Sequence, residues 1–230
     1  MRHIIAALFA LAFTAAVAGD YEDGWAAYER QDYATALAKF SSAAQQGSDA
    51  AQFSLGFMYA KGQGVVQDYA EAVRWYRLAA AQGLADAQLN LGVIYGNGQG
   101  VAQDYAEAMR WYKLAAAQGN ASAQFNLALN YDLGQGVTQD YEEAVRWYRL
   151  AAAQRNVSAQ VNLGLMYSRG KGVTQNYVKA HMWYNLAAVK GESDAVKNRD
   201  IVAAKMAPQQ IAEAQRLARE CQTRNFKNCD

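Results

Sequence analysis

The chain is 230 residues long, 52% hydrophobic, and carries 22 Lys and Arg residues against 21 Asp and Glu residues. A net charge this close to zero provides no general attraction to nucleic acid or to an anionic membrane surface. With one proline and two cysteines, the composition is typical of an all-helical domain with a long continuous core.

The N-terminal segment has the pattern of a secretory signal peptide. Arg2 is followed by an apolar run over residues 4–17 and by small residues around position 18. A run of about 14 residues is shorter than the roughly 20 that cross a bilayer. We therefore predict a signal peptide over residues 1–18, export to the periplasm and no membrane span after cleavage. An uncleaved anchor is the alternative. Without Arg2 the mature chain has 21 basic and 21 acidic residues, a net charge of zero.

Residues 19–31 are expected to form an N-terminal capping helix, in which Trp25 and Tyr28 cover the first repeat. After it, a 36-residue unit recurs without insertion or deletion. The copies start at residues 32, 68, 104, 140 and 176. A fixed period of this size is typical of stacked helical pairs, which gives five repeats over residues 32–206.

One repeat contains two helices and a glycine-rich loop. Asp68 is predicted to cap the first helix, with Glu71 completing a capping box. The second helix is predicted over about residues 86–97. The glycines after it, Gly98 and Gly100, resemble a phosphate loop, but the same glycines recur in every such connection. We therefore interpret them as positions where the backbone turns at positive φ.

The recurring pattern A-Q-x-N-L-G-x-x-Y-x-x-G-x-G-V, followed by D-Y-x-E-A-x-x-W-Y-x-L-A-A, resembles the Sel-one-like repeat (SLR) family, relatives of tetratricopeptide repeats. The resemblance implies an all-α, right-handed α/α superhelix of about five helical pairs with capping helices. Ala128 departs from the family pattern because it stands where Gly56, Gly92 and Gly164 stand. The prolines often seen before the family's helix cap are replaced here by Val66, Ala102, Thr138 and Thr174.

The tail, residues 207–230, is predicted to form a C-terminal capping helix with Pro208 near its start. Cys221 and Cys229 both lie in this tail. In an oxidising compartment two neighbouring cysteines without competitors are expected to form a disulfide. Two free thiols are the alternative if export fails.

The sequence does not favour an enzyme. His181 occupies an apolar column of the first helix and, after signal cleavage, has no second histidine to share a metal. Ser122 and Ser158 are interpreted as N-caps of second helices. Cysteine-rich relatives in the resembling family are linked to β-lactam binding, but no repeat here contains a cysteine. We therefore predict no catalytic residue, no metal and no cofactor.

Two columns of basic residues are candidate partner-binding sites. The columns consist of Arg74, Arg110 and Arg146, and of Arg77, Lys113 and Arg149. Such a ridge suits an acidic peptide, a carboxyl terminus or an anionic glycan. The alternative is a solvated face neutralised by acidic residues, namely Glu71, Glu107 and Glu143.

A third column, formed by Asn90, Asn126 and Asn162, has the amide groups that clamp a peptide backbone, although it can equally bond a neighbouring repeat. The tryptophans that recur once per repeat are interpreted as helix packing. The resemblance implies a non-catalytic adaptor in envelope assembly, signalling or exopolysaccharide regulation, with a protein or peptide partner. A glycan- or peptidoglycan-binding module is the first alternative, and an envelope hydrolase is the weaker one.

Overall fold

The computed structural model of the chain describes residue 17 and residues 19–229. The rest of the predicted signal peptide, residues 1–16 and 18, therefore lies outside the described residues. Between residues 19 and 229 every regular element is an α-helix and no strand forms. None of the described helices combines the length and apolar character needed to span a bilayer.

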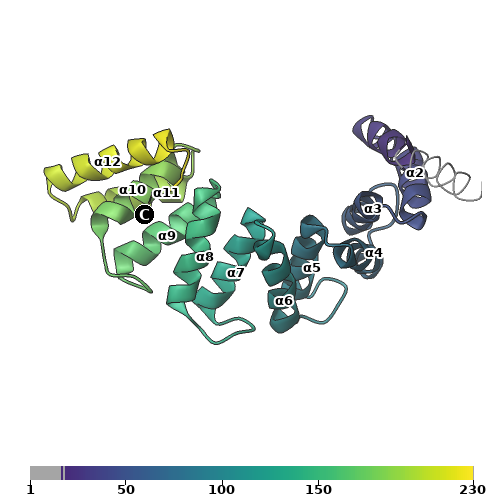
Figure 1. The fold of residues 1–230 in the computed structure, drawn as a ribbon, viewed down its shortest axis with the longest axis horizontal. Helices are drawn as coiled ribbons and strands as arrows, with labels where there is room; N and C mark the ends of the chain where they lie inside the picture. Colours follow the sequence, from purple (N-terminus) through teal and green to yellow (C-terminus); the bar gives the residue numbers. More distant parts are fainter. Residues whose placement is uncertain (1–16, 18, 230) are drawn as a thin grey trace, which may run out of the picture. The chain divides into compact units, whose positions relative to one another are not determined.

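A helix over residues 19–29, here named the leading helix, precedes the repeats. The helices that follow are α2 (Tyr33–Gln45), α3 (Asp49–Lys61), α4 (Tyr69–Ala81), α5 (Ala85–Asn97), α6 (Tyr105–Ala117), α7 (Ala121–Leu133), α8 (Tyr141–Ala153), α9 (Val157–Arg169), α10 (Tyr177–Ala188), α11 (Ser193–Ala203) and α12 (Pro208–Thr223) (Figure 1). In each repeat the even-numbered helix is the first helix and the odd-numbered helix is the second.

The chain divides into two compact units, with the boundary between Trp111 and Tyr112 inside α6. In the N-terminal unit, α2 packs on α3, α3 on α4, and α4 on α5. In the C-terminal unit, α7 packs on α8, α8 on α9, α9 on α10, and α10 on both α11 and α12. Consecutive packing of this kind confirms the predicted α-solenoid of helical pairs.

The first helices begin at the predicted caps. The Asp68 carboxylate accepts from the backbone N–H groups of Ala70 and Glu71 at 2.8 and 3.0 Å. The predicted second half of the capping box is wrong, because the Asp68 N–H donates to the Tyr59 carbonyl at 3.0 Å. Glu71 turns instead to Arg74. The loop that reaches back to the preceding helix has already satisfied the cap N–H.

The predicted bounds of the second helices agree with the structure, as α5 over Ala85–Asn97 shows, but the predicted N-caps lie two residues too late. Asn120 and Asn156 are the N-caps of α7 and α9, and their side chains accept from the N–H groups of Ala123 and Ala159 at 3.0 and 2.9 Å. Ser122 and Ser158, predicted to be these caps, lie inside the first turn. Several residue types in the segment have a suitable side-chain oxygen, so composition alone did not select the right one.

The glycine-rich loops turn the backbone as expected. Gly62 ends α3 in the left-handed region with φ of 68°, and Gly64 follows with φ of 72°. A Cβ on Gly64 would lie 2.8 Å from the Cβ of Tyr33, so the loop passes directly over the preceding first helix. Both the dihedral and the close approach require glycine.

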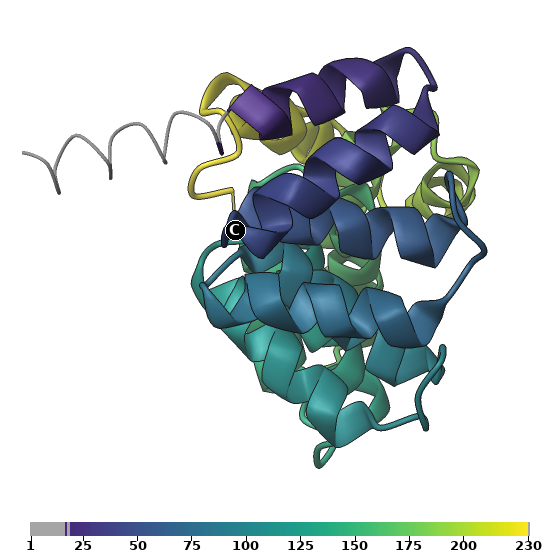
Figure 2. The same ribbon diagram turned by 90° about the vertical axis from the view of Figure 1, so that its right-hand side faces the viewer.

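The core of the N-terminal unit joins the leading helix to α2 and α3. Its buried residues include Ala27, Ala36, Phe40, Leu55 and Met58. Figure 2 shows this unit, with the purple leading helix lying beside α2. Full burial of each Phe, Leu or Met side chain stabilises the fold by about 1.5–3 kcal/mol.

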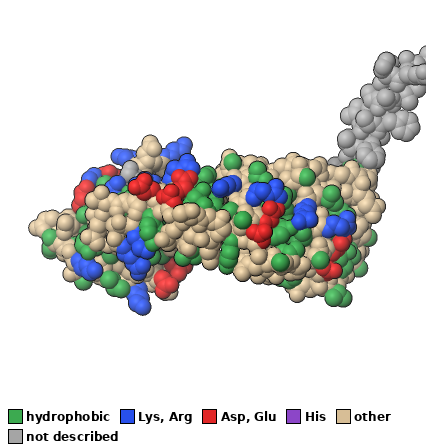
Figure 3. Space-filling view, turned by 90° about the horizontal axis from the view of Figure 1, so that it is seen from below, with side chains coloured by type: hydrophobic (Ala, Val, Ile, Leu, Met, Phe, Trp, Pro, Cys, Tyr) green, Lys and Arg blue, Asp and Glu red, His purple; other side chains and the backbone are tan. Residues whose placement is uncertain are grey.

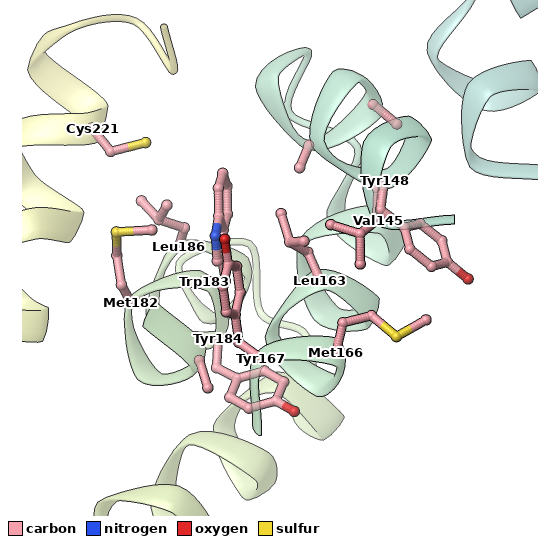
Figure 4. Close-up of a cluster of buried hydrophobic side chains, with 14 of the residues drawn as sticks. Val145, Tyr148, Leu163, Met166, Tyr167, Met182, Trp183, Tyr184, Leu186 and Cys221 are labelled. Atoms are coloured by element: carbon pink, nitrogen blue, oxygen red, sulfur yellow. The ribbon is translucent and has the colours of Figure 1, made fainter. Parts of the chain in front are cut away.

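The core of the C-terminal unit is layered in chain order. In Figure 4, Leu163 and Met166 of α9 lie between Tyr148 of α8 and the α10 residues Trp183 and Tyr184. The core continues to Cys221 on α12, which is buried. Helix α12 therefore packs on α10, the first helix of the last pair.

The tail is closed by a disulfide between Cys221 and Cys229, which confirms the predicted bond. Arg155 reaches this tail from the loop after α8, because its guanidinium donates to the Asn225 side chain at 2.5 Å and lies 5.0 Å from the Phe226 ring centroid.

Candidate partner-binding site

Two second helices, α3 and α9, carry a glycine that receives an aromatic ring from the next first helix. A Cβ on Gly56 of α3 would lie 2.7 Å from the ring of Tyr76, and one on Gly164 of α9 would lie 2.7 Å from the ring of Tyr184. Contacts this short do not occur between real atoms, so only glycine lets the ring pack on the helix backbone. The ring then forms the floor of the space between two successive second helices.

In the N-terminal unit this space is a pocket of about 350 Å³ between α3 and α5. Tyr76 forms its floor, Phe57 and Lys61 line the α3 side, and Asn90 and Val93 line the α5 side. The combination of an apolar surface with an amide and a cation suits a segment of polypeptide, which offers both side chains and backbone groups.

A second pocket occupies the same register in the C-terminal unit, three periods of 36 residues later. It measures about 230 Å³ and lies between α9 and α11 over Tyr184. Every lining residue of this pocket has its counterpart in the first: Leu165 for Phe57, Ser168 for Ala60, Arg169 for Lys61, Tyr177 for Tyr69, Asn198 for Asn90, Ile201 for Val93, Val202 for Ile94 and Lys205 for Asn97. The same positions of two repeats therefore form a pocket.

A third pocket, of about 240 Å³, lies between the leading helix and α3. Its floor is Phe40, which packs on Gly24 as Tyr76 packs on Gly56. Gly24 is 32 rather than 36 residues before Gly56, because the connection from the leading helix to α2 is four residues shorter than the later ones. The leading helix, predicted as a separate cap, thus has the place of a second helix.

Between α7 and α9 the same register is polar. Asp132 stands where Ala60, Gly96 and Ser168 stand, and its carboxylate accepts from the Tyr148 hydroxyl at 3.4 Å. The same hydroxyl accepts from the Asn162 amide at 3.0 Å. Burial raises the pKa of Asp132, while the nearby Lys171 acts in the opposite direction.

Two members of the asparagine column, Asn90 and Asn198, line the pockets described above. Asn90 lines the pocket over Tyr76 and donates one amide N–H to the Asp86 carbonyl of its own helix at 2.9 Å. Asn126 is half-buried, and Asn162 bonds Tyr148 of the preceding first helix. Sequence reasoning missed the fourth member, Asn198, although it lies one period after Asn162.

The first basic column is neutralised within its own helices. The guanidinium groups of Arg74, Arg110 and Arg146 pair with Glu71, Glu107 and Glu143 at 2.6, 2.6 and 2.5 Å. Each arginine lowers the pKa of its glutamate partner. Each guanidinium also lies 4.1–4.7 Å from the ring centroid of the tryptophan that follows it. On the face in Figure 3, basic and acidic side chains accordingly lie next to one another.

The second basic column packs on tyrosines of the next second helix. Arg77 bonds the hydroxyl of Tyr95, and Arg149 bonds that of Tyr167 at 2.7 Å. Lys113 lies 6.0 Å from the ring centroid of Tyr131. These contacts tie the first helix of a repeat to its second helix, so part of each cation's bonding capacity is used inside the fold.

His181 is almost fully buried in α10, with 3% of its surface exposed. Burial lowers its pKa, and Arg199 acts in the same direction. Within the described residues, no group of three or more His, Cys, Asp or Glu side chains is arranged to hold a metal ion. The imidazole is a neutral part of the core.

Helical pairs of fixed length, stacked on one another with pockets in a fixed register, define an α-solenoid repeat scaffold. The Sel1 repeat family model matches residues 49–84, 85–120, 121–156 and 157–191, which together are more than half of the chain. The chain belongs to the Sel1 repeat family. Each matched unit joins a second helix to the first helix that follows it, which is the pair that buries the Gly56 and Tyr76 contact.

Solved structures show the same fold. A Sel1 repeat protein from Oxalobacter formigenes is 35% identical over 76% of this chain and 72% of its own, with a TM-score of 0.72. A protective antigen present in uropathogenic Escherichia coli strains, with an SLR fold, is 29% identical over 93% of this chain and 54% of its own, with a TM-score of 0.59. An immunity protein from Pseudomonas aeruginosa, 20% identical over 90% of this chain and 83% of its own, matches with a TM-score of 0.51 and shares the fold alone. No curated protein matches the chain. Sel1 repeat proteins are generally protein-interaction scaffolds and are typically non-catalytic.

Proposed function

We propose that this protein is an exported, non-catalytic adaptor that binds an extended segment of a protein partner in the pockets between its second helices. The recurrence of one pocket, in one register, with an asparagine in its wall carries the proposal. A partner segment laid across such a pocket meets an aromatic floor and an amide.

The asparagine amides supply the polar contacts in this account. An asparagine side chain has two N–H donors and a carbonyl acceptor. Asn90 uses one donor within its own helix, which leaves a donor and an acceptor for the two kinds of group on a peptide backbone. In the C-terminal unit Asn198 lines the second pocket, and Asn126 and Asn162 are its equivalents in the preceding repeats.

The basic columns contribute less to partner affinity than the pockets do. Exposed ion pairs between Arg and Glu three residues apart are worth little, but they oblige an anionic partner to compete with the glutamate for each guanidinium. In this account the first basic column, Arg74, Arg110 and Arg146, orients the partner rather than providing most of the affinity. The second column, Arg77, Lys113 and Arg149, has the same role, because its side chains already contact tyrosines of the fold. We assign the larger share of affinity to the pockets.

The disulfide supports the export part of the proposal, because such bonds persist in oxidising compartments. Together with the signal-peptide pattern of residues 1–18, it favours the periplasm. A role in envelope assembly, signalling or exopolysaccharide regulation follows from that location and from the family.

Crosslinked capture from an envelope extract tests the proposal with two variants that separate its parts. The first changes Asn90, Asn126, Asn162 and Asn198 to alanine, and the second changes the six residues of the basic columns to glutamine. We expect the asparagine variant to lose the partner and the basic variant to keep it at reduced yield. If the asparagine variant kept the partner in full, the pockets would not be the binding site.

A further inference from the structure

The pocket between the leading helix and α3 differs from the other two because aromatic rings dominate its lining. Tyr21, Trp25 and Tyr28 come from the leading helix, Phe40 from α2, and Phe53 and Phe57 from α3. Trp25 is 45% exposed, so the pocket opens to solvent. Its rings stand as walls at steep angles, with Trp25 at 67° to Tyr28 and at 78° to Phe40.

Elsewhere in the described chain, several aromatic rings have one of the chain's own cations against them. Arg74 lies 4.1 Å from the ring centroid of Trp75, and Lys171 lies 4.5 Å from that of Tyr141. Among the six rings of this pocket, the described residues place such a cation only on Phe57, from Lys61 at 5.8 Å. Lys61 lines the neighbouring pocket over Tyr76.

The leading helix carries an acidic residue where α3 carries a basic one. Aligning Gly24 with Gly56 places Trp25 on Phe57 and Glu29 on Lys61. Glu29 lies one turn after Trp25 and Glu22 one turn before it on the same helix, and both are exposed. Side chains spaced by three and four residues share a helix face, so two carboxylates flank the open edge of the pocket where later repeats carry a cation or a neutral residue.

We propose that this aromatic pocket binds a quaternary ammonium group. Faces of aromatic rings attract cations, and a cage of several rings is the usual way to hold an alkylated ammonium. The pocket offers few acceptors, because the only side-chain oxygens among its lining residues are the hydroxyls of Tyr21, Tyr28 and Ser54. A lysine or arginine N–H group that met no hydroxyl oxygen would stay unbonded among the rings, which is costly, whereas a quaternary ammonium has no N–H group.

Choline and its neutral isostere 3,3-dimethyl-1-butanol separate charge from shape. Binding of each to the full chain is followed by titration calorimetry and by the indole N–H resonance of Trp25, assigned with the Trp25→Leu variant. We expect choline to bind at least about 10-fold more tightly than the isostere, and Trp25→Leu to weaken choline binding by at least about 10-fold. Thermal unfolding verifies that the variant remains folded.

Charge removal at the rim has a matched control. Glu29→Gln is expected to weaken choline binding by about 2- to 5-fold and to leave the isostere unchanged. Glu142→Gln, an exposed glutamate on α8, is expected to change neither. Equal affinity for choline and the isostere, absence of choline binding at about 100 mM, or choline binding that survives Trp25→Leu would each overturn the proposal. An unchanged choline affinity in Glu29→Gln would overturn the role of the acidic rim.

Discussion

Gly56 and Tyr76 are in contact so close that a single added carbon on Gly56 would lie 2.7 Å from the tyrosine ring. Gly56 is on α3 and Tyr76 is on α4, so the contact fixes a second helix against the next first helix. Tyr76 has only 1% of its surface exposed, and the ring has no room to retreat. The pocket floor therefore depends on the absence of a side chain at residue 56.

The Gly56→Ala substitution is expected to destabilise the fold by about 1 kcal/mol. Alanine gains about 1 kcal/mol over glycine in a helix interior, but overpacking a well-packed contact costs about 1–3 kcal/mol. Denaturant unfolding of the variant measures the balance. Since the tyrosine ring must move into the pocket, partner binding should fall as well.

The chain contains its own control for Gly56→Ala, because Ala128 occupies the same column beside Tyr148. Here the Cβ is already accommodated, so Ala128→Gly relieves no clash and should lose about 1 kcal/mol of helix propensity. If Gly56→Ala instead stabilised the fold by about as much as Ala128→Gly destabilised it, helix propensity would explain both results. The contact with the Tyr76 ring would then contribute nothing to stability.

Glu107 and Arg110 should show weak coupling. Their ion pair measures 2.6 Å, yet the arginine side chain is 59% exposed. A double-mutant cycle with Glu107→Gln and Arg110→Gln is expected to give a coupling energy of about 0.3–0.5 kcal/mol that falls with added salt. A coupling energy above about 1.5 kcal/mol would mean that the first basic column is a structural network and that its charges are unavailable to a partner.

His181 makes stability sensitive to mild acid. Burial and Arg199 lower the pKa of the folded imidazole below the ordinary 6.5, against a smaller opposing effect of Asp200. Below pH 6.5 the unfolded chain therefore binds a proton that the folded chain does not. Stability is full above that pH and falls as the pH is lowered, by at most about 1.4 kcal/mol per pH unit.

Urea unfolding of the wild type and of His181→Met at pH 5 to 7.5 isolates this effect. Methionine is the residue at the equivalent position of α6, Met109. The variant should lose the part of the slope that lies just below pH 6.5. An unchanged slope would show that the imidazole takes up a proton in the folded state.

Reduction of the Cys221–Cys229 bond should release the tail. The two residues are eight apart, and closing a loop of that size stabilises by about 2–3 kcal/mol in the chain-entropy model. Hydrogen exchange at residues 221–228 should accelerate after reduction, as should exchange at Arg155, whose contacts reach Asn225 and Phe226. The Cys221→Ser and Cys229→Ser variants should behave alike. Unchanged protection in the reduced protein would mean that helix packing alone holds the tail.

Much of the fold follows from periodicity, because an unbroken 36-residue period leaves only one way to stack the helices. The caps of first helices were predictable from Asp68 and its equivalents, since each aspartate stands directly before an apolar stripe. The caps of second helices were not, because Asn120 and Ser122 both offer a suitable oxygen. The place of the leading helix was hidden by the shorter connection to α2, which breaks the period.

The candidate site was predictable only in part. The asparagine column is visible in the sequence, because the same residue recurs every 36 positions. Adding one further period to Asn162 identifies Asn198. The pockets depend on which face of a second helix meets the next first helix, and that geometry is decided by the contact of Gly56 with Tyr76. The polar register between α7 and α9 could have been predicted from Asp132, because it is a charged residue in a column otherwise occupied by small residues.

A photocrosslinking amino acid at Val93 tests the central claim most directly. Val93 is half-buried in the wall of the pocket between α3 and α5, and Leu78, 42% exposed on α4, is the control position outside that pocket. In an envelope extract, the account predicts a crosslinked protein partner from position 93 and none from position 78. Crosslinks from position 78 with none from position 93 would contradict it and move binding to the exposed face of the first helices.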